Sequence, residues 1–159
     1  MSHDEWSRVD EYLRDALKLT DPVLDSAVKR TADSGLPAIE VTPHQGKLLH
    51  LLARIRGAQR ILEVGTLAGY STIWLARALP PGGTLVTLEL LPEHAVVARA
   101  NLDAAGLSER ATVYVGPALE SLDALVDERT APFDFIFIDA DKASTPQYFE
   151  RALALASVG

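Results

Sequence analysis

Two carboxylates and an ammonium group follow one short apolar segment of the chain. Asp139, Asp141 and Lys142 come directly after residues 133–138, which are rich in β-forming apolar residues. Carboxylate oxygens suit a hard cation such as Mg²⁺, and a nearby lysine can accept a proton. A helix-capping acid beside an exposed ion pair would account for these residues equally well. The pattern alone leaves the chemical and the structural interpretation open.

A second candidate is the glycine-containing segment at residues 63–71. Gly65 and Gly69 allow a ligand to approach the backbone closely before a helix begins. Their spacing differs from the G-x-G-x-x-G pattern that binds the pyrophosphate of a dinucleotide. Glu63, which stands shortly before Gly65, would suit a ligand's ammonium group.

Two further turns point to a nucleoside ligand. Glu89 follows the apolar run 85–88, where a carboxylate can accept hydrogen bonds from both hydroxyls of a ribose. A solvated loop acid is the structural alternative. Gly116, Pro117 and Ala118 follow the run 112–115 and would present backbone to an adenine ring, although a plain turn into a helix explains them equally well.

The segments that must position these residues alternate between strand-like and helix-like patterns. We expect strands at residues 61–64, 85–88, 112–115 and 133–138, and helices at 71–79, 92–105, 119–127 and 146–156. Strands joined by helix-length crossovers pair in parallel. The sequence therefore predicts an open α/β sheet of doubly wound type, with ligands outside the carboxyl ends of its strands.

Residues 1–57 have the pattern of a helical leader. Apolar positions between residues 9 and 17 predict a first helix, and Asp21 with Pro22 begins a second that ends near residue 29. Thr42 and Gln45 supply the capping box of a third helix, which Gly57 terminates. We expect this leader to cover the ligand or to form a dimer contact.

Composition bounds the class of protein. A chain of 159 residues, 48% hydrophobic and 23% charged, is expected to fold as one domain. The net charge of -7 argues against binding to nucleic acid, and the absence of cysteine removes disulfides and thiolate chemistry. The acidic start and the short uncharged stretch at 64–76 argue against a signal peptide or a membrane span, so we expect a cytoplasmic protein.

Other aromatic and histidine residues receive structural interpretations. Trp74 is expected in the core, whereas Tyr70 is open between core and ligand contact. The histidines have no metal-ligand spacing and are expected at the surface or at helix ends. They are His3, His44, His50 and His94.

These motifs together resemble those of the cation-dependent class I O-methyltransferases of caffeoyl-CoA O-methyltransferase type, with catechol O-methyltransferase a more distant relative. The resemblance covers nearly the whole chain and rests on residues 41–46, 61–71, 116–118 and 139–142 and on Glu89. It implies a Rossmann-like methyltransferase sheet of strand order 3-2-1-4 within residues 58–159. It also implies S-adenosylmethionine as the donor, bound near Val41, Glu63, Gly65, Thr66, Gly69, Ser71, Glu89, Leu90, Gly116, Pro117, Ala118 and Asp139.

The same resemblance assigns chemical roles. It makes Asp139 a metal ligand, Asp141 an acid on the substrate side and Lys142 the general base. The implied metal is Mg²⁺, Mn²⁺ or Ca²⁺, since the ligand offered is a carboxylate. The implied reaction is methyl transfer to a hydroxyl of a small phenolic or catechol-type acceptor, with a homodimer as the expected assembly. A nicotinamide-dependent oxidoreductase and a non-catalytic donor-binding module are the alternatives.

Two features depart from the family pattern. Thr145 stands where many members have an aromatic residue, while Tyr148 matches a later tyrosine. The family also completes its metal site with an adjacent Asp and Asn after a fifth strand, and the sequence ends at Gly159 before such a strand. We therefore expect a chain truncated at its C-terminus, with later strands missing, an exposed strand edge at 133–138, poor metal affinity and doubtful activity on its own.

Overall fold

The computed structural model describes residues 3–19 and 21–158, and its elements follow the predicted order. Three helices form the leader: α1 (His3–Ala16), α2 (Pro22–Asp33) and α3 (Pro43–Arg56). Strands and helices then alternate through β1 (Arg60–Val64), α4 (Tyr70–Ala76), β2 (Thr84–Glu89), α5 (Pro92–Ala104), β3 (Ala111–Val115), α6 (Ala118–Asp127), β4 (Phe135–Ile138) and α7 (Thr145–Leu155).

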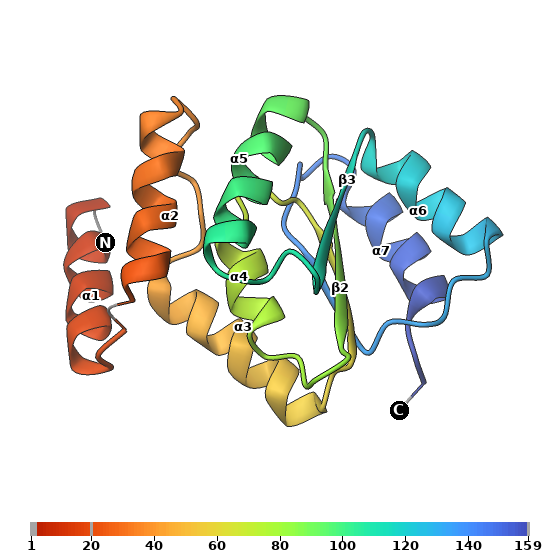
Figure 1. Ribbon diagram of the computed structural model, residues 1–159, viewed down its shortest axis with the longest axis horizontal. Coiled ribbons are helices and arrows are strands. Elements are labelled where there is room, and N and C mark those ends of the chain that lie inside the picture. The colour runs from red at the N-terminus through yellow and green to blue at the C-terminus, as the bar shows by residue number, and fades with distance from the viewer. Residues whose placement is uncertain (1–2, 20, 159) are drawn as a thin grey trace.

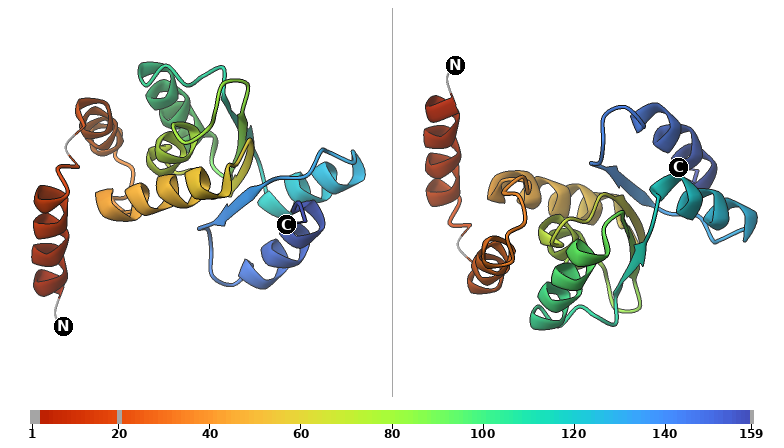
Figure 2. Two further views of the ribbon diagram at one scale, coloured as in Figure 1. Left: turned by 90° about the horizontal axis from the view of Figure 1, so that it is seen from below. Right: turned by 90° about the horizontal axis from the view of Figure 1, so that it is seen from above.

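The four strands form one parallel sheet in the order β3-β2-β1-β4, which confirms the predicted topology. Helices α3, α4 and α5 cover one face of this sheet and α6 and α7 cover the other, while α1 and α2 lie outside the first layer (Figures 1 and 2). Val64 stands opposite both Leu88 and Ile138 in the register. The carboxyl ends of the strands therefore lie level, at one edge of the sheet.

Each face of the sheet has its own apolar core. Side chains of successive strand residues point to opposite faces, so Ile61 packs under α4 and α5 whereas Leu62 packs on the side of α6 and α7. Trp74 is 7% exposed and belongs to the first core, as predicted. Burial on both faces explains why these strands are nearly continuous apolar runs.

The last strand begins later than the sequence predicted. Phe133 forms only an isolated bridge with Ala156, and β4 starts at Phe135. The reason lies in Asp134, whose Oδ2 accepts hydrogen bonds from the backbone N–H groups of Gln59, at 2.8 Å, and Arg60, at 3.0 Å. The carboxylate thus ties the chain to the start of β1. Strand β4 is an edge of the sheet, and its residues are only partly buried.

The predicted helix caps are confirmed. Asp21 caps α2 by accepting hydrogen bonds from the N–H groups of Val23 and Leu24, and Gln45 accepts one from the N–H of Thr42 at 2.9 Å. Gly57 ends α3 in a left-handed conformation with φ +68°. Along the described residues, no helix is both long and apolar enough to cross a membrane.

Candidate functional site

The turns after the strands meet around a cavity of about 730 Å³. Backbone hydrogen bonds fix these turns to neighbouring strands: the N–H of Gly65 donates to the carbonyl of Leu88 at 3.0 Å, and that of Asp139 to the carbonyl of Val64 at 2.8 Å. The N–H of Gly116 donates in the same way to the carbonyl of Glu89. A volume of this size is typical of small-molecule sites.

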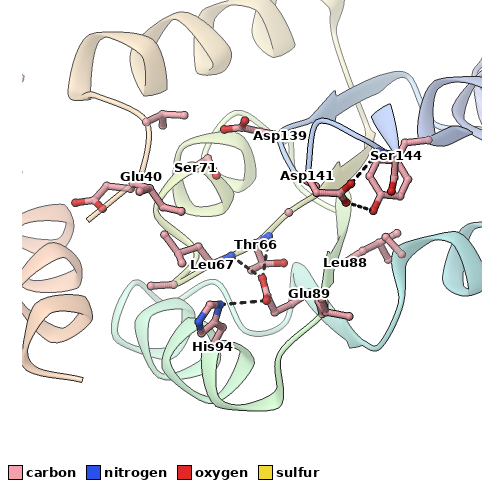
Figure 3. Close-up of a pocket in the computed structure, with 18 of the residues that line it drawn as sticks. Glu40, Thr66, Leu67, Ser71, Leu88, Glu89, His94, Asp139, Asp141 and Ser144 are labelled. Atoms are coloured by element: carbon pink, nitrogen blue, oxygen red, sulfur yellow. Dashed lines mark hydrogen bonds and ion pairs between the residues drawn. The ribbon is translucent and has the colours of Figure 1, made fainter. Parts of the chain in front are cut away.

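Most of the predicted site residues line this one cavity, although they come from separate segments of the chain (Figure 3). The leader contributes Val41 through the connection between α2 and α3, and the other walls come from the turns after the strands. The predicted residues brought together there are Val41, Gly65, Thr66, Ser71, Glu89, Leu90, Pro117, Ala118, Asp139, Asp141 and Lys142.

Gly69 and Gly116 are not among the lining residues, but both shape the turns that are. Gly69 has φ +81° and is the N-cap of α4, where the loop after β1 becomes a helix. Gly116 has φ +140° and follows the last residue of β3. Their contribution in this structure is to the backbone path rather than to the cavity surface.

Glu63 lies behind the cavity wall in this structure, and its place beside a ligand's ammonium group stays a prediction. Its side chain is fully buried. One carboxylate oxygen accepts a hydrogen bond from Ser71 Oγ at 2.6 Å, and the other accepts from Thr72 Oγ1 at 2.5 Å and Thr87 Oγ1 at 2.7 Å. Burial raises the pKa of Glu63 to about 7, although these hydroxyl donors oppose the rise. In this structure Glu63 holds the side chain of Ser71 by a hydrogen bond, and Ser71 lines the cavity.

Glu89, the last residue of β2, lies in the wall of the cavity as predicted for a ligand contact. Its Oε2 accepts hydrogen bonds from the N–H groups of Thr66, at 3.2 Å, and Leu67, at 2.7 Å. Its Oε1 accepts one from the N–H of Leu91 at 3.0 Å and lies 3.2 Å from His94 Nδ1. The carboxylate therefore joins the first turn of the sheet to the second.

His94 lies at a helix end, as expected, but the sequence pattern did not predict that it lines the cavity. His94 stands near the start of α5, but its side chain is only 17% exposed and lines the cavity. The signal that would have found it is the short connection from β2 to α5. A helix that begins so soon after a strand turns its first residues toward the end of that strand.

The acids after β4 have different environments. Asp139 is 43% exposed and lies 3.4 Å from Nζ of Lys142, whose side chain is 86% exposed. Asp141 accepts hydrogen bonds from Tyr148 Oη at 2.6 Å and from the N–H of Ser144 at 2.8 Å. The bond from Tyr148, together with those from Ser144, holds the pKa of Asp141 below its ordinary value. Asp139 and Lys142 are therefore the exposed charged pair at this end of the cavity.

The described residues do not fit the predicted divalent cation by themselves. Within residues 3–19 and 21–158, no three His, Cys, Asp or Glu side chains form a group that could hold a metal ion. Asp139 offers one exposed carboxylate, and the carboxylate of Asp141 is held by Tyr148 and Ser144. Mg²⁺ needs about six oxygen ligands.

Other residues also differ from or extend the sequence-based picture. Tyr70, for which the sequence allowed either a core position or a ligand contact, is 7% exposed and contributes to the cavity wall. His50 Nδ1 lies 3.1 Å from the carbonyl of Trp74, and burial lowers the pKa of His50. His44 lies 3.6 Å from Asp10, while the side chain of His3 is outside the described residues.

A family model described as O-methyltransferase matches residues 15–159. The chain belongs to the O-methyltransferase family. Among its curated relatives, this O-methyltransferase is 50% identical to a catechol O-methyltransferase of Niastella koreensis, over all of this chain and 72% of that protein. It is 48% identical to a catechol O-methyltransferase of Mycobacterium tuberculosis, over 95% of this chain and 67% of the relative.

Solved structures agree on the fold of this O-methyltransferase. An O-methyltransferase from Bacillus cereus in complex with SAH superposes with a TM-score of 0.95 at 51% identity, over 98% of this chain and 71% of that one. The O-methyltransferase TomG from Streptomyces achromogenes, in complex with SAM, gives a TM-score of 0.92 at 46% identity, over 100% and 71%. These relatives confirm the predicted family and give no support to the nicotinamide-dependent alternative.

Proposed function

We propose that this O-methyltransferase transfers a methyl group from S-adenosylmethionine to a hydroxyl of a small, catechol-type phenol. The observation that carries the proposal is that one cavity is lined by Glu89 and, across it, by Asp139 (Figure 3), which forms an exposed pair with Lys142. The names of the relatives support it, because two are called catechol O-methyltransferase and two structures contain SAH or SAM.

The donor part of the proposal assigns the nucleoside to the turn after β2. The carboxylate of Glu89 accepts hydrogen bonds from the ribose hydroxyls. Leu90, next to it, is 60% exposed and offers an apolar surface to the adenine ring. Ser71 and Asp139 line the cavity beyond the loop after β1 that contains Gly65 and Gly69, here called the glycine loop, and the amino-acid end of the donor would lie there. The sulfonium methyl then faces the segment that carries Lys142.

The acceptor part of the proposal depends on ionising the phenol. A phenol with a pKa of about 10 is about 0.1% ionised at pH 7, which costs roughly 4 kcal/mol. Neutral Lys142 accepts the proton of the phenol, and the ammonium group that results stabilises the phenolate. The phenolate oxygen attacks the methyl carbon in line with the sulfur, and the electron pair of the breaking bond stays on sulfur. Holding both partners in one cavity supplies the positioning.

The proposal assigns no role to a divalent cation at Asp139, because the described residues offer such an ion one carboxylate. The effect of Mg²⁺ on methyl transfer is therefore measured.

The experiment is transfer of labelled methyl from S-adenosylmethionine to catechol, to phenol and to a saturated diol, with Mg²⁺ and with a chelator. We expect label on catechol first and none on the saturated diol, whose hydroxyls ionise far less readily. Loss of transfer in the chelator would assign the metal a role.

Two results would overturn the proposal. Binding of S-adenosylmethionine without transfer to any of these hydroxyls would favour the non-catalytic module. Transfer to amine or thiol acceptors in preference to catechol would show that the acceptor class is wrong. Product identification by mass and by the position of the label separates these outcomes.

A further inference from the structure

The carboxylate of Glu89 is more completely held than a solvated acid would be. In the part of the chain that the structure describes, three groups that contact it are the backbone N–H groups of Thr66, Leu67 and Leu91. The fourth is the ring of His94, with Nδ1 at 3.2 Å from Oε1. The side chain of Glu89 is 8% exposed. The pair thus lies within the wall of the cavity, as Figure 3 shows.

His94 differs from the other three contacts because it is a side chain and can be changed without altering the backbone. The two N–H groups on Oε2 belong to the glycine loop, whereas Oε1 has the N–H of Leu91 and the imidazole. Nδ1 of His94 lies within ion-pair distance of Oε1, and the contact is attractive when Nδ1 carries a proton, because a carboxylate only accepts hydrogen bonds. Without it, Oε1 keeps a single described partner, and the carboxylate gains freedom to rotate.

We propose that His94 is a positioning residue for recognition of the donor's ribose: through the contact of its Nδ1 with Oε1, it fixes the carboxylate of Glu89 in the orientation that meets the ribose hydroxyls. This inference rests on the proposed donor site and adds a residue to it. His94 acts through Glu89, and its effect therefore appears only with a ligand that has the ribose hydroxyls.

The test compares the binding of two ligands to wild type and to two variants, and it requires no catalytic activity. Calorimetry measures the affinity of S-adenosylhomocysteine and of its analogue lacking both ribose hydroxyls, for the wild-type chain and for His94→Leu and His94→Asn. Asparagine can place an amide N–H close to the position of Nδ1, whereas leucine has a similar volume and no donor. Circular dichroism and thermal unfolding establish that each variant is folded.

We expect His94→Leu to bind S-adenosylhomocysteine about 3–10-fold more weakly than wild type and to bind the analogue with unchanged affinity. We expect His94→Asn to restore binding to within about twofold of wild type. Equal weakening of both ligands by His94→Leu would show a merely structural role and overturn the proposal. Failure of asparagine to restore binding would overturn it as well.

Glu89→Ala, measured with the same two ligands, separates this inference from the proposed function. If Glu89→Ala also affects both ligands equally, the ribose is not recognised by Glu89 and the donor site itself is wrong. If Glu89→Ala distinguishes the ligands and His94→Leu does not, only the role of His94 is overturned. Long-range ¹H–¹⁵N correlation spectra give a check without substitution, because a proton on Nδ1 of His94 is required and its absence contradicts the proposal.

Discussion

A Cβ atom at Gly65 would lie 2.1 Å from the backbone carbonyl oxygen of Asp139. Gly65 also has φ +100°, a conformation that residues with a side chain rarely adopt. The turn after β1 and the turn after β4 therefore touch backbone to backbone. Through this contact the glycine loop stays next to the segment that carries Asp139 and Lys142.

Gly65→Ala is accordingly expected to disturb both turns. The strained φ and the clash with Asp139 together should lower the free energy of unfolding by about 2–4 kcal/mol and weaken donor binding. Gly57→Ala is the matched control, because Gly57 also has a positive φ but a Cβ there meets nothing within 4 Å. Urea unfolding and calorimetry measure the two effects. Equal losses in the two variants would show that the contact with Asp139 is unimportant.

The buried Glu63 should make the stability of the protein depend on pH. Its pKa is about 7 in the folded protein, against an ordinary value of 4.5 for a glutamate side chain. Between these values the unfolded chain has lost the proton while the folded chain keeps it, so stability falls as pH rises through this window, by about 3 kcal/mol in all. Glu63→Gln removes the titrating group, and the fall should shrink by that amount. Urea unfolding of both proteins at pH 4, 5, 6, 7 and 8 measures it, and a difference independent of pH would refute the prediction.

Asn101 should matter for the glycine loop although it does not line the cavity. It is 1% exposed, its Nδ2 donates to the carbonyl of Ala68 at 2.8 Å, and its Oδ1 accepts a hydrogen bond from Arg30 of α2. Asn101→Leu leaves that carbonyl buried without this partner, which should cost about 1–3 kcal/mol of stability. Ser108→Ala is the control, since the hydrogen bond from Ser108 to Asp103 is long and exposed. Similar unfolding midpoints for the two variants would contradict this.

Lys142→Ala should separate turnover from donor binding. Loss of a general base typically lowers the rate about 10²–10⁴-fold, whereas the exposed Lys142 has little part in holding the donor. Lys29→Ala is the control, because Lys29 forms an exposed ion pair with Asp33 on α2, away from the cavity. Initial rates with catechol and calorimetry with S-adenosylhomocysteine check the prediction. A Lys142→Ala variant as fast as wild type would remove Lys142 from the chemistry.

Local signals account for what the sequence predicts correctly. The apolar runs that became β1 to β4 are separated by helices long enough to force parallel crossovers, and Asp21, Gln45 and Gly57 act at helix ends through contacts a few residues away. Glu89 and Asp139 reach the cavity because they stand directly at the carboxyl ends of strands. These inferences need only spacing along the chain.

The features that the sequence could not predict depend on the direction of side chains and on contacts between residues far apart in the chain. The pattern of the sequence does not show that Glu63 accepts hydrogen bonds from Ser71 and Thr72 of α4, behind the cavity wall. His94 meets Glu89 only because α5 folds back over the end of β2. The shortening of β4 depends on Asp134 binding the backbone before β1, a contact between residues far apart in the chain.

The most direct test of the central claim is a crystal structure of this chain with S-adenosylhomocysteine bound. We predict that the ligand lies in the cavity of about 730 Å³, with the ribose hydroxyls within hydrogen-bond distance of Glu89 and the sulfur facing the segment that carries Asp139 and Lys142. A ligand bound elsewhere, or a ribose whose hydroxyls meet groups other than Glu89, would contradict it.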